Sequence, residues 1–519
     1  MTSAKEKYIF ILASLALSAG AAFFFLRGAP AAFPVDDAYI HLCYARSLAD
    51  GAGFSFNAGE PSFGTSSPLW VMLLALFVRS LDSTLLIRAL SWAALWTILA
   101  FSALIISQSL RPGLGPARKT TFERYFFPLM AAALLAASGN FLWITFSGME
   151  SGLWVALALA AVYFLVRKNP SWAGYPVLGL TALCRMETAF LLVIVFLWQL
   201  LNVKDKRKVL AGFAITLAIA ASFYVYAHFR LGTFSPTTRA GKLASDLFNA
   251  GLSLRGGFAF LQRHIAYLRL TQPGALVALG LALLGLALWA VSPRRAQVGP
   301  AGVTAFFALA IFLYHDQFFR STAAITPFHN FRYQVFFFPA LALGLARIFG
   351  EAYSALNSRP ARAMTVIILL ALPGFYRLAP WHDLYLGQCA HVRDVHIKAG
   401  EWCKTSLPEK ARIACFDIGA LKFFSDRYVI DLGGLVDPLA HPYLRQRAVG
   451  PYLQKMSATH YAELGTPGSE RLLGVKKDAG KLYQLVPLAY FPGKRMREPV
   501  LLHSWEMKIF ELKWLETPK

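Results

Sequence analysis

The stretch YIFILASLALSAGAAFFFL occupies residues 8–26 and follows a short start that carries Lys5 and Lys7. The stretch is continuously apolar, and a helix needs roughly 20 such residues to cross a bilayer. A cleaved signal peptide is the alternative, because residues 29–31 are small like those of a cleavage site. The run is long for a signal peptide, so we favour an uncleaved anchor with a cytoplasmic N-terminus.

The rest of the chain continues this pattern. Hydrophobic residues make up 56% of the 519 residues, which is more than a soluble domain covers with polar surface. Further apolar segments, among them 126–146 and 275–291, bring the number of predicted spans to about eleven. The apolar segment 68–78 is too short to span and is expected to be an interfacial helix. Basic residues cluster in loops after the even-numbered spans. By the positive-inside rule these loops are cytoplasmic. The sequence therefore predicts a polytopic α-helical membrane protein with about eleven transmembrane helices.

The composition changes sharply near residue 380, from apolar segments to ordinary globular sequence. We therefore expect a transmembrane module over residues 1–379, whose first outer loop covers about 27–83, and a soluble α/β domain over 380–519 on the outer side. The secondary structure expected in this domain is a helix over 391–403, a strand over 412–417, a short helix over 419–424 and a strand over 428–432.

The formal net charge of +23 would suggest nucleic acid as a partner in a soluble protein. Here the Lys and Arg residues lie between apolar segments, where they contact anionic membrane lipids. No aromatic-basic RNA motif and no zinc-finger spacing occurs. We therefore expect membrane lipids as partners and no nucleic acid.

Five cysteines are too few for a disulfide framework. Cys43 and Cys184 lie in or beside apolar segments and are expected to be packing residues. Cys389, Cys403 and Cys415 lie in the C-terminal domain, where an oxidising compartment would allow one disulfide. No Cys or His spacing is typical of zinc.

Two adjacent carboxylates, Asp36 and Asp37, follow Pro34 just outside the first span, where a helix is expected to begin. The simplest interpretation is helix capping, because Asp is a good N-cap and complements the helix dipole. A carboxylate at the membrane boundary also suits a general base, since partial burial raises its pKa toward neutrality.

The first loop resembles that of GT-C membrane glycosyltransferases, and most closely the branch of mycobacterial-type terminal arabinofuranosyltransferases. Protein mannosyltransferases and aminoarabinose transferases are more distant. The resemblance rests on DDAYIHLCYAR (36–46), LADGAG (48–53), FNAGE (56–60), SPLW (67–70), GME (148–150), RME (185–187), FSPTTRAGK (234–242), DIGAL (417–421) and YVIDLGGLVDP (428–438).

This resemblance implies transfer of a sugar from a polyprenyl-phosphate donor to an acceptor hydroxyl on a glycan, lipid or protein, at the outer membrane face. A pentofuranose such as arabinofuranose is one candidate sugar. The branch has Pro-Asn-Thr where this chain has Pro236-Thr237-Thr238, so a contact of that Asn amide is lost or replaced. The membrane is taken to be a bacterial inner membrane, with the outer domain periplasmic.

The resemblance also suggests roles for the Asp pair. Asp36 matches the Asp of an Asp-Glu pair in the distant relatives, so we prefer it as the base that takes the acceptor proton, with inversion. Asp37 would orient the acceptor, position Asp36 or hold a cation. A divalent cation is the one cofactor considered, and the sequence leaves it open.

The leaving lipid phosphate needs a positive charge nearby as the bond between sugar and phosphate breaks. Arg suits this role because its guanidinium can donate two parallel hydrogen bonds to a phosphate. Contact with lipid headgroups is the competing interpretation for any one of these side chains. The candidates in outer segments are Arg239 and Lys242 first, then Arg332, Arg185 and Arg320.

Candidate substrate-binding residues lie in the same outer segments: Tyr39, His41, Tyr44, Arg46 and Glu150. For Glu150, helix capping is an equal alternative. For the aromatic residues, an interfacial aromatic belt is the simpler explanation.

A transporter or flippase of lipid-linked sugars is the rival function, since it also spans the membrane and binds lipid phosphates. Such a protein is expected to show paired halves and acidic residues near the bilayer midplane. The sequence shows neither feature. A GT-C-like scaffold without activity is a third possibility, and the intact Asp pair argues against it.

Overall fold

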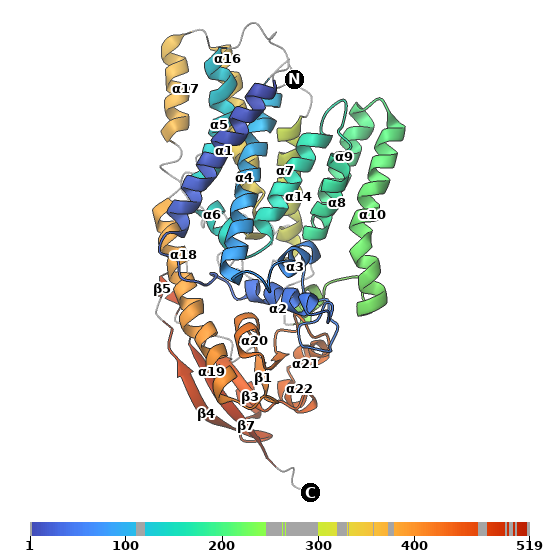
Figure 1. Ribbon diagram of the computed structural model, residues 1–519, viewed down its shortest axis with the longest axis vertical. Coiled ribbons are helices and arrows are strands. Elements are labelled where there is room, and N and C mark those ends of the chain that lie inside the picture. Colours follow the sequence, from blue (N-terminus) through green and yellow to red (C-terminus); the bar gives the residue numbers. More distant parts are fainter. Residues whose placement is uncertain are drawn as a thin grey trace.

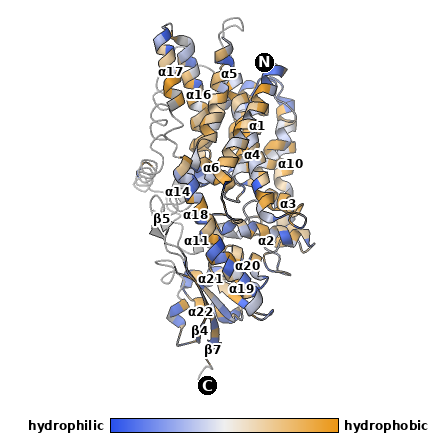
Figure 2. Ribbon diagram, turned by 60° about the vertical axis from the view of Figure 1, so that its left-hand side comes forward, coloured by the Kyte–Doolittle hydropathy of each residue, from blue (hydrophilic) through white to orange (hydrophobic). Residues whose placement is uncertain are grey.

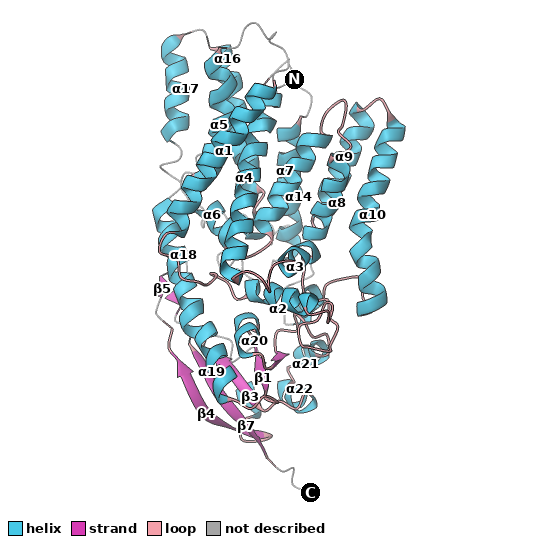
Figure 3. Ribbon diagram, in the orientation of Figure 1, coloured by secondary structure: helices cyan, strands magenta, loops and turns pink. Residues whose placement is uncertain are grey.

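The computed structural model describes most of the chain (Figure 1). The described residues are 3–110, 120–244, 262, 265, 299–318, 330, 332–356, 358–371, 378–465, 475–493, 496–497, 502–503 and 506–515. They form a largely helical N-terminal part and a C-terminal region (residues 378–515) that contains every strand of the named sheets (Figure 3).

Before residue 378, the named elements are all helical. They are α1 (Ala4–Leu26), α2 (Asp37–Ala49), α3 (Pro68–Ala75), α4 (Ser83–Ser109), α5 (Thr121–Ala136), α6 (Gly139–Phe146), α7 (Ser151–Leu165), α8 (Gly174–Cys184), α9 (Thr188–Asn202), α10 (Lys206–Leu231), α11 (Thr237–Ala244), α14 (Pro300–Phe318), the 3₁₀ turn η1 (Arg332–Gln334), α16 (Phe337–Ala355) and α17 (Arg359–Ala371). Figure 2 shows hydrophobic residues along the long helices and more hydrophilic residues in the C-terminal region.

Three helices in the described part are long and apolar enough to cross a membrane: α1, α4 and α10. Helices α5 and α6 make a fourth candidate as a pair bent by 66°. The bend corrects the straight span expected over 126–146, and it follows two residues that interrupt the helix at Ala137 and Ser138. The chain is thus a multi-pass membrane protein with several shorter apolar helices beside its spans. The span expected at 275–291 lies outside the described residues.

Sequence signals at the helix ends explain where the long helices begin and end. In α1 and α5 a capping box joins Ser3 to Glu6 and Thr120 to Glu123, so two orphan backbone amides are satisfied at each start. Helix α10 ends where Gly232 adopts a left-handed conformation (φ 70°), which glycine accepts without strain.

The first outer loop contains two helices that are not spans. Helix α2 lies across the direction of the long helices, between them and the C-terminal region (Figure 1). The apolar segment expected to be interfacial over 68–78 forms the short helix α3, which packs against α2 and α8. Residues 27–83 thus form the layer between the helical part and the sheet.

The C-terminal region starts with a long helical stretch: α18 (Leu378–Val392), the π-turn η3 (Arg393–Ile397) and α19 (Lys398–Ser406). The other elements are β1 (Arg412–Cys415), α20 (Gly419–Ser425), β2 (Tyr428–Asp431), α21 (Ala440–Gln446), α22 (Val449–Lys455), β3 (His460–Leu464), α24 (Val475–Asp478), β4 (Tyr483–Phe491), β5 (Met496–Arg497), β6 (Leu502–His503) and β7 (Met507–Trp514). The helices and strands expected over 391–432 are confirmed.

These strands form a mixed sheet in the order β2-β1-β3-β7-β4. Strand β1 pairs in parallel with β2 and β3, whereas β7 pairs antiparallel with β3 and β4. The parallel half contains the β1-α20-β2 unit, and β2 is an edge strand of this sheet. Because β2 is at the edge, its outer backbone groups are available to another part of the chain.

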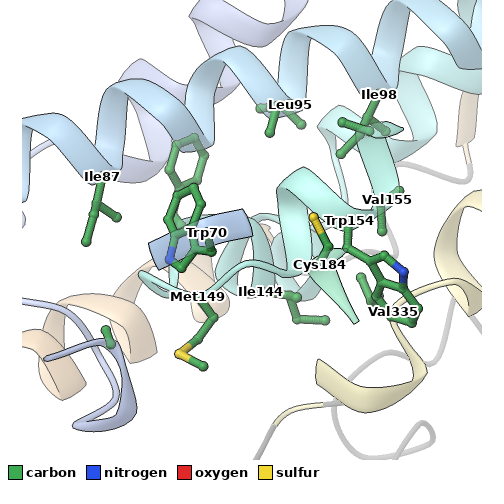
Figure 4. Close-up of a cluster of buried hydrophobic side chains, with 14 of the residues drawn as sticks. Trp70, Ile87, Leu95, Ile98, Ile144, Met149, Trp154, Val155, Cys184 and Val335 are labelled. Carbon is green, nitrogen blue, oxygen red and sulfur yellow. The ribbon is translucent and has the colours of Figure 1, made fainter. Parts of the chain in front are cut away.

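The hydrophobic core runs through both parts. Figure 4 shows a cluster within it, which includes Trp70, Ile98, Ile144 and Trp154 from four helices and Val335 from the turn before α16. The same cluster continues into Ile418 and Leu421 beside α20. Between membrane-spanning helices such a cluster stabilises the fold by van der Waals packing, because the surrounding lipid is as apolar as these side chains.

All five cysteines lie in described parts of the chain and are buried free thiols. The disulfide that Cys389, Cys403 and Cys415 would allow is absent. For Cys43 and Cys184, burial agrees with the expected packing role.

Candidate active site

Helix α2 positions the two adjacent carboxylates. Asp36 is the N-cap residue and Asp37 is the first residue of the helix, yet the Asp36 side chain makes no capping bond to α2 itself. The expected helix start is confirmed, but simple capping of α2 does not explain Asp36. Each carboxylate instead contacts a different part of the molecule.

Asp37 faces the helical part. Its Oδ2 accepts a hydrogen bond of 2.9 Å from Nη2 of Arg332, and its side chain remains 40% exposed while that of Arg332 is 3% exposed. These two residues are 295 positions apart in the sequence. The contact therefore brings the start of the first loop to the turn before α16.

Two of the three guanidinium nitrogens of Arg332 lack a hydrogen-bond partner in the described structure. Its Nη2 also donates to the Tyr333 hydroxyl at 3.3 Å, whereas the buried Nε and Nη1 have no hydrogen-bond partner among the residues that the structure describes. Unpaired buried guanidinium donors are costly. Two free donors on a buried cation are the groups that a phosphate oxygen would satisfy.

Glu150 lies beside this pair, at the start of α7. Its Oε1 accepts a 2.8 Å hydrogen bond from Nη1 of Arg185, and its Oε2 lies 3.5 Å from Nε2 of His41. The Nδ1 of His41 is in turn 3.0 Å from the Thr65 hydroxyl. Burial raises the pKa of Glu150, but the neighbouring His41 and Arg185 outweigh it and lower this pKa to about 2. These neighbours therefore favour the ionised form of Glu150.

The second arginine differs from Arg332. The Nη1 of Arg185 donates to Glu150, and its Nε and Nη2 donate to the two carboxylate oxygens of Glu187. Its guanidinium also lies 5.5 Å from the ring of Tyr333. We refer to Asp37, Glu150, Arg185, Glu187 and Arg332 as the charged cluster. Within it, Arg332 is better placed than Arg185 to receive an anion.

Asp36 faces the C-terminal region. Its Oδ2 accepts a hydrogen bond from the Gly419 backbone amide at 2.6 Å, and its Oδ1 accepts one from the Ala420 amide at 2.7 Å. Asp36 thus satisfies the first amides of α20, 383 and 384 residues later in the chain. We call this the docking contact.

Two further ionisable groups surround the docking contact. Nε2 of His396, in the π-turn η3, lies 3.2 Å from Oδ2 of Asp417. Burial is the largest effect on Asp36 and, with the charge of Asp417, raises its pKa to about 7, although His396 and the two amides oppose this rise. Burial lowers the pKa of His396, but its partner Asp417 and the charge of Asp36 reverse the direction and raise it.

Three predicted substrate-binding residues have other contacts. Tyr39 is buried, and its hydroxyl accepts from the Phe33 amide. The hydroxyl of Tyr44 accepts from the Gly64 amide. Arg46 donates to the Phe423 carbonyl and to Asp426 in the C-terminal region. These contacts give the three residues a part in packing the first loop, and we do not carry them into the proposed site.

The other three basic residues predicted to bind the donor phosphate are only partly described by the structure. Arg239 and Lys242 lie on α11, but their side chains are outside the described structure, as is the whole of Arg320. The helix itself is held at Thr237, whose amide donates to the Phe63 carbonyl at 2.8 Å and whose hydroxyl donates to the Leu435 carbonyl at 2.6 Å. Thr237 is the residue that departs from the Asn of the resembled branch.

The structure adds residues that the sequence did not single out: Thr65, Glu187 and Tyr333 in the charged cluster and its surroundings, and His396 beside the docking contact. Tyr333 directly follows Arg332, so the adjacent position was a usable signal. His396 had none, because it meets Asp417 only through the fold. In the part of the chain that the structure covers, no three His, Cys, Asp or Glu residues form a group that could hold a metal ion.

Comparison with known proteins finds one matching domain family and several solved structures of similar fold. Residues 386–498 match the family model of a domain of unknown function (DUF8728). No curated protein sequence matches the chain. Among solved structures, ArnT from Cupriavidus metallidurans in the apo state is similar with a TM-score of 0.53 and 13% identity, over 98% of each chain.

Two further structures are similar to lesser degrees. ArnT bound to undecaprenyl phosphate gives a TM-score of 0.51 at 13% identity, again over 98% of each chain. The archaeal oligosaccharyltransferase AglB from Archaeoglobus fulgidus, in complex with an inhibitory peptide and a dolichol-phosphate, gives 0.47 at 13% identity over 86% of this chain and 69% of that chain. The chain thus has an ArnT-like fold over nearly its whole length.

Proposed function

We propose that this chain is a polyprenyl-phosphate-dependent glycosyltransferase of the GT-C class that transfers a sugar to an acceptor hydroxyl. The observation that carries the proposal is the pair of Asp37 and Arg332. A partly exposed carboxylate lies 2.9 Å from a buried guanidinium whose Nε and Nη1 have no partner in the described structure. A base and a phosphate ligand therefore meet at the first outer loop.

The transfer needs both groups. The acceptor hydroxyl gives its proton to Asp37 as its oxygen bonds to the anomeric carbon. The bond from that carbon to the lipid phosphate oxygen breaks, and the phosphate leaves with the electron pair. Arg332 receives the developing negative charge with donors that are already desolvated. Attack and departure on opposite faces invert the anomeric centre.

The preference for Asp37 as the base reverses the choice suggested by the resemblance. Both oxygens of Asp36 accept backbone amides of α20, whereas the Asp37 side chain is 40% exposed beside Arg332. A base must reach the acceptor proton directly or through one water molecule. Exposure and the adjacent phosphate ligand support Asp37 in this role.

The polyprenyl phosphate is supported by the fold likeness. ArnT, whose fold this chain shares, has been solved bound to undecaprenyl phosphate, so a fold of this kind holds such a lipid. We further propose about eleven spans, a cytoplasmic N-terminus and a periplasmic domain over 380–519 in a bacterial inner membrane. Arabinofuranose, suggested by the first-loop resemblance, is the first donor sugar to test.

The test is an assay of the purified full chain in lipid nanodiscs with a panel of polyprenyl-phosphate sugars and simple acceptor alcohols. We expect release of polyprenyl phosphate together with one inverted glycoside. Absence of transfer from every donor would reject the proposal. Movement of lipid-linked sugar across liposomes without any transfer would establish the flippase function in its place.

A further inference from the structure

The C-terminal region is joined to the first loop by backbone as well as side-chain contacts. The Asn57 side chain bonds to the β2 backbone: its Nδ2 donates to the Val429 carbonyl at 2.9 Å, and its Oδ1 accepts from the Val429 amide at 3.1 Å. This pair of bonds imitates a neighbouring strand at the open edge of β2. The first loop therefore completes the sheet at this position.

The loop and the region also approach closely at glycines. A Cβ atom added to Gly419 would overlap the backbone carbonyl of Asp36, and one added to Gly241 of α11 would overlap the carbonyl of Gly434. Only glycine permits backbones to come this near. The packing of α20 on α2 thus depends on the absence of a side chain at residue 419.

Asp36 is the ionisable member of this interface. Both of its side-chain oxygens accept hydrogen bonds from amides at the start of α20, which would otherwise lack partners within the helix. Asp36 is joined to Asp37 by one peptide bond, which spans about 3.8 Å between Cα atoms. Whatever fixes Asp36 therefore also fixes the start of α2 from which Asp37 reaches Arg332.

We propose that Asp36 is a positioning residue: it holds the C-terminal region against α2, and this contact sets the position of Asp37 toward Arg332. The proposal rests on the proposed function for its catalytic consequence. On this proposal the C-terminal region contributes to the geometry of the active site, although none of its side chains belongs to the charged cluster.

The rival role for Asp36 is the general base itself, and a pKa near 7 would suit that role as well. The two roles differ in what a mutation at residue 419 should do. A Cβ at Gly419 presses on the carbonyl and Oδ2 of Asp36, so it disturbs the docking contact while every carboxylate group is chemically retained. A base at Asp36 would keep its proton acceptor in that variant, whereas a positioning contact would be lost.

The experiment compares Asp36→Ala, Asp36→Asn and Gly419→Ala in the full chain, with Gly344→Ala as the matched control because a Cβ there meets nothing within 4 Å. We expect Gly419→Ala and Asp36→Ala to lower kcat about 10- to 100-fold, with the donor KM within about twofold because Arg332 is untouched. Asp36→Asn keeps a carbonyl acceptor for one amide and should retain more activity than Asp36→Ala.

Hydrogen exchange at residues 419–436 provides a second readout. Asp36→Ala and Gly419→Ala should exchange faster there than wild type and Gly344→Ala. Equal inactivity of Asp36→Asn and Asp36→Ala, with Gly419→Ala as active as wild type, would overturn the proposal and make Asp36 the base. If wild type transfers no sugar, the proposed function fails, and unchanged exchange in both variants would then reject the docking role separately.

Discussion

On the helical side of α2, Asp37 meets a buried arginine with two unpaired nitrogens in the described structure. On the other side, Asp36 meets two backbone amides that satisfy both of its oxygens. The residues are neighbours in the sequence, and both are aspartate. The environment of Asp37 retains donors without partners in the described structure, which is typical of a binding site. In the environment of Asp36 both carboxylate oxygens have partners, which is typical of a structural contact.

This difference shows that two adjacent acids can lie in two separate environments. Consecutive residues at a helix start point about 100° apart, so a pair at the boundary between two layers sends one side chain into each. The chemistry of each carboxylate then follows from the layer that it faces. The mutations below test whether the two sides are as different as their contacts indicate.

The largest effect is expected for Asp37→Asn, which keeps the size of the side chain and removes the base. Transfer should fall by about 10²- to 10⁴-fold, while donor binding to the purified protein is retained. Asp50→Asn is the control, since Asp50 ends the same helix and pairs with Arg79 in an exposed salt bridge. A variant Asp37→Asn with near wild-type kcat would place the base elsewhere.

The second largest loss of activity is expected for substitutions of Arg332. Arg332→Ala is expected to lower kcat by about 10²- to 10³-fold, since it removes the charge that stabilises the leaving phosphate. Arg332→Lys keeps the charge but loses the planar fork and should lie between Ala and wild type. Arg347→Lys on the next helix, where Arg347 pairs with Glu351, should behave as wild type. Kinetics of all three at saturating donor test this order.

A smaller effect concerns pH and the docking contact. The folded-state pKa of Asp36 is raised to about 7, above the usual aspartate value of about 3.9, so folding takes up a proton at intermediate pH. The stability from this group is therefore complete below about pH 4 and is lost as pH rises through about 7. The raised pKa of His396 has the same sign.

We accordingly expect the thermal midpoint of wild type to fall as pH rises from about 5 to about 7 and to level off above the folded-state pKa. Asp36→Asn, which cannot titrate, should show a shallower fall over the same range. Differential scanning fluorimetry on both proteins in one buffer series gives the comparison. Parallel pH curves for the two proteins would contradict a titrating docking contact.

The smallest effect is expected at the rim of the same interface. Glu60 accepts a hydrogen bond from the Tyr428 hydroxyl at an exposed position, and Glu60→Gln keeps a carbonyl acceptor. Its unfolding free energy should change by less than about 0.5 kcal/mol, as measured by denaturant titration. A loss as large as that of Asp36→Ala would mean that the rim, rather than the docking contact, holds the C-terminal region.

Much of this architecture follows from local patterns in the sequence. The long spans α1, α4 and α10 have continuous apolar runs, and the β1-α20-β2 unit has clear strand and helix signals. The bend between α5 and α6 was missed because the apolar pattern continues across it. The gathering of His41, Glu150, Arg185 and Arg332 on one face was partly accessible, since each was placed at the outer end of a span.

The separate roles of Asp36 and Asp37 could not be obtained in this way. Their difference depends on where α20 begins, and that helix is fixed by tertiary packing hundreds of residues later. The contacts of Tyr39 with Phe424 and of Arg46 with the Phe423 carbonyl depend on tertiary packing in the same way. The role of these two residues in substrate binding stays a prediction.

The distance along the chain between Asp36 and α20 has a consequence for biosynthesis. The amide of Ala420 is made 384 residues after the carboxylate that it contacts. At roughly 5–20 residues per second, a ribosome needs about 20–80 s to cover that interval. During this interval the first loop lacks the partner that α20 provides. We therefore expect a nascent or truncated chain to insert its spans normally and to remain catalytically silent until its last quarter has been translated and has folded.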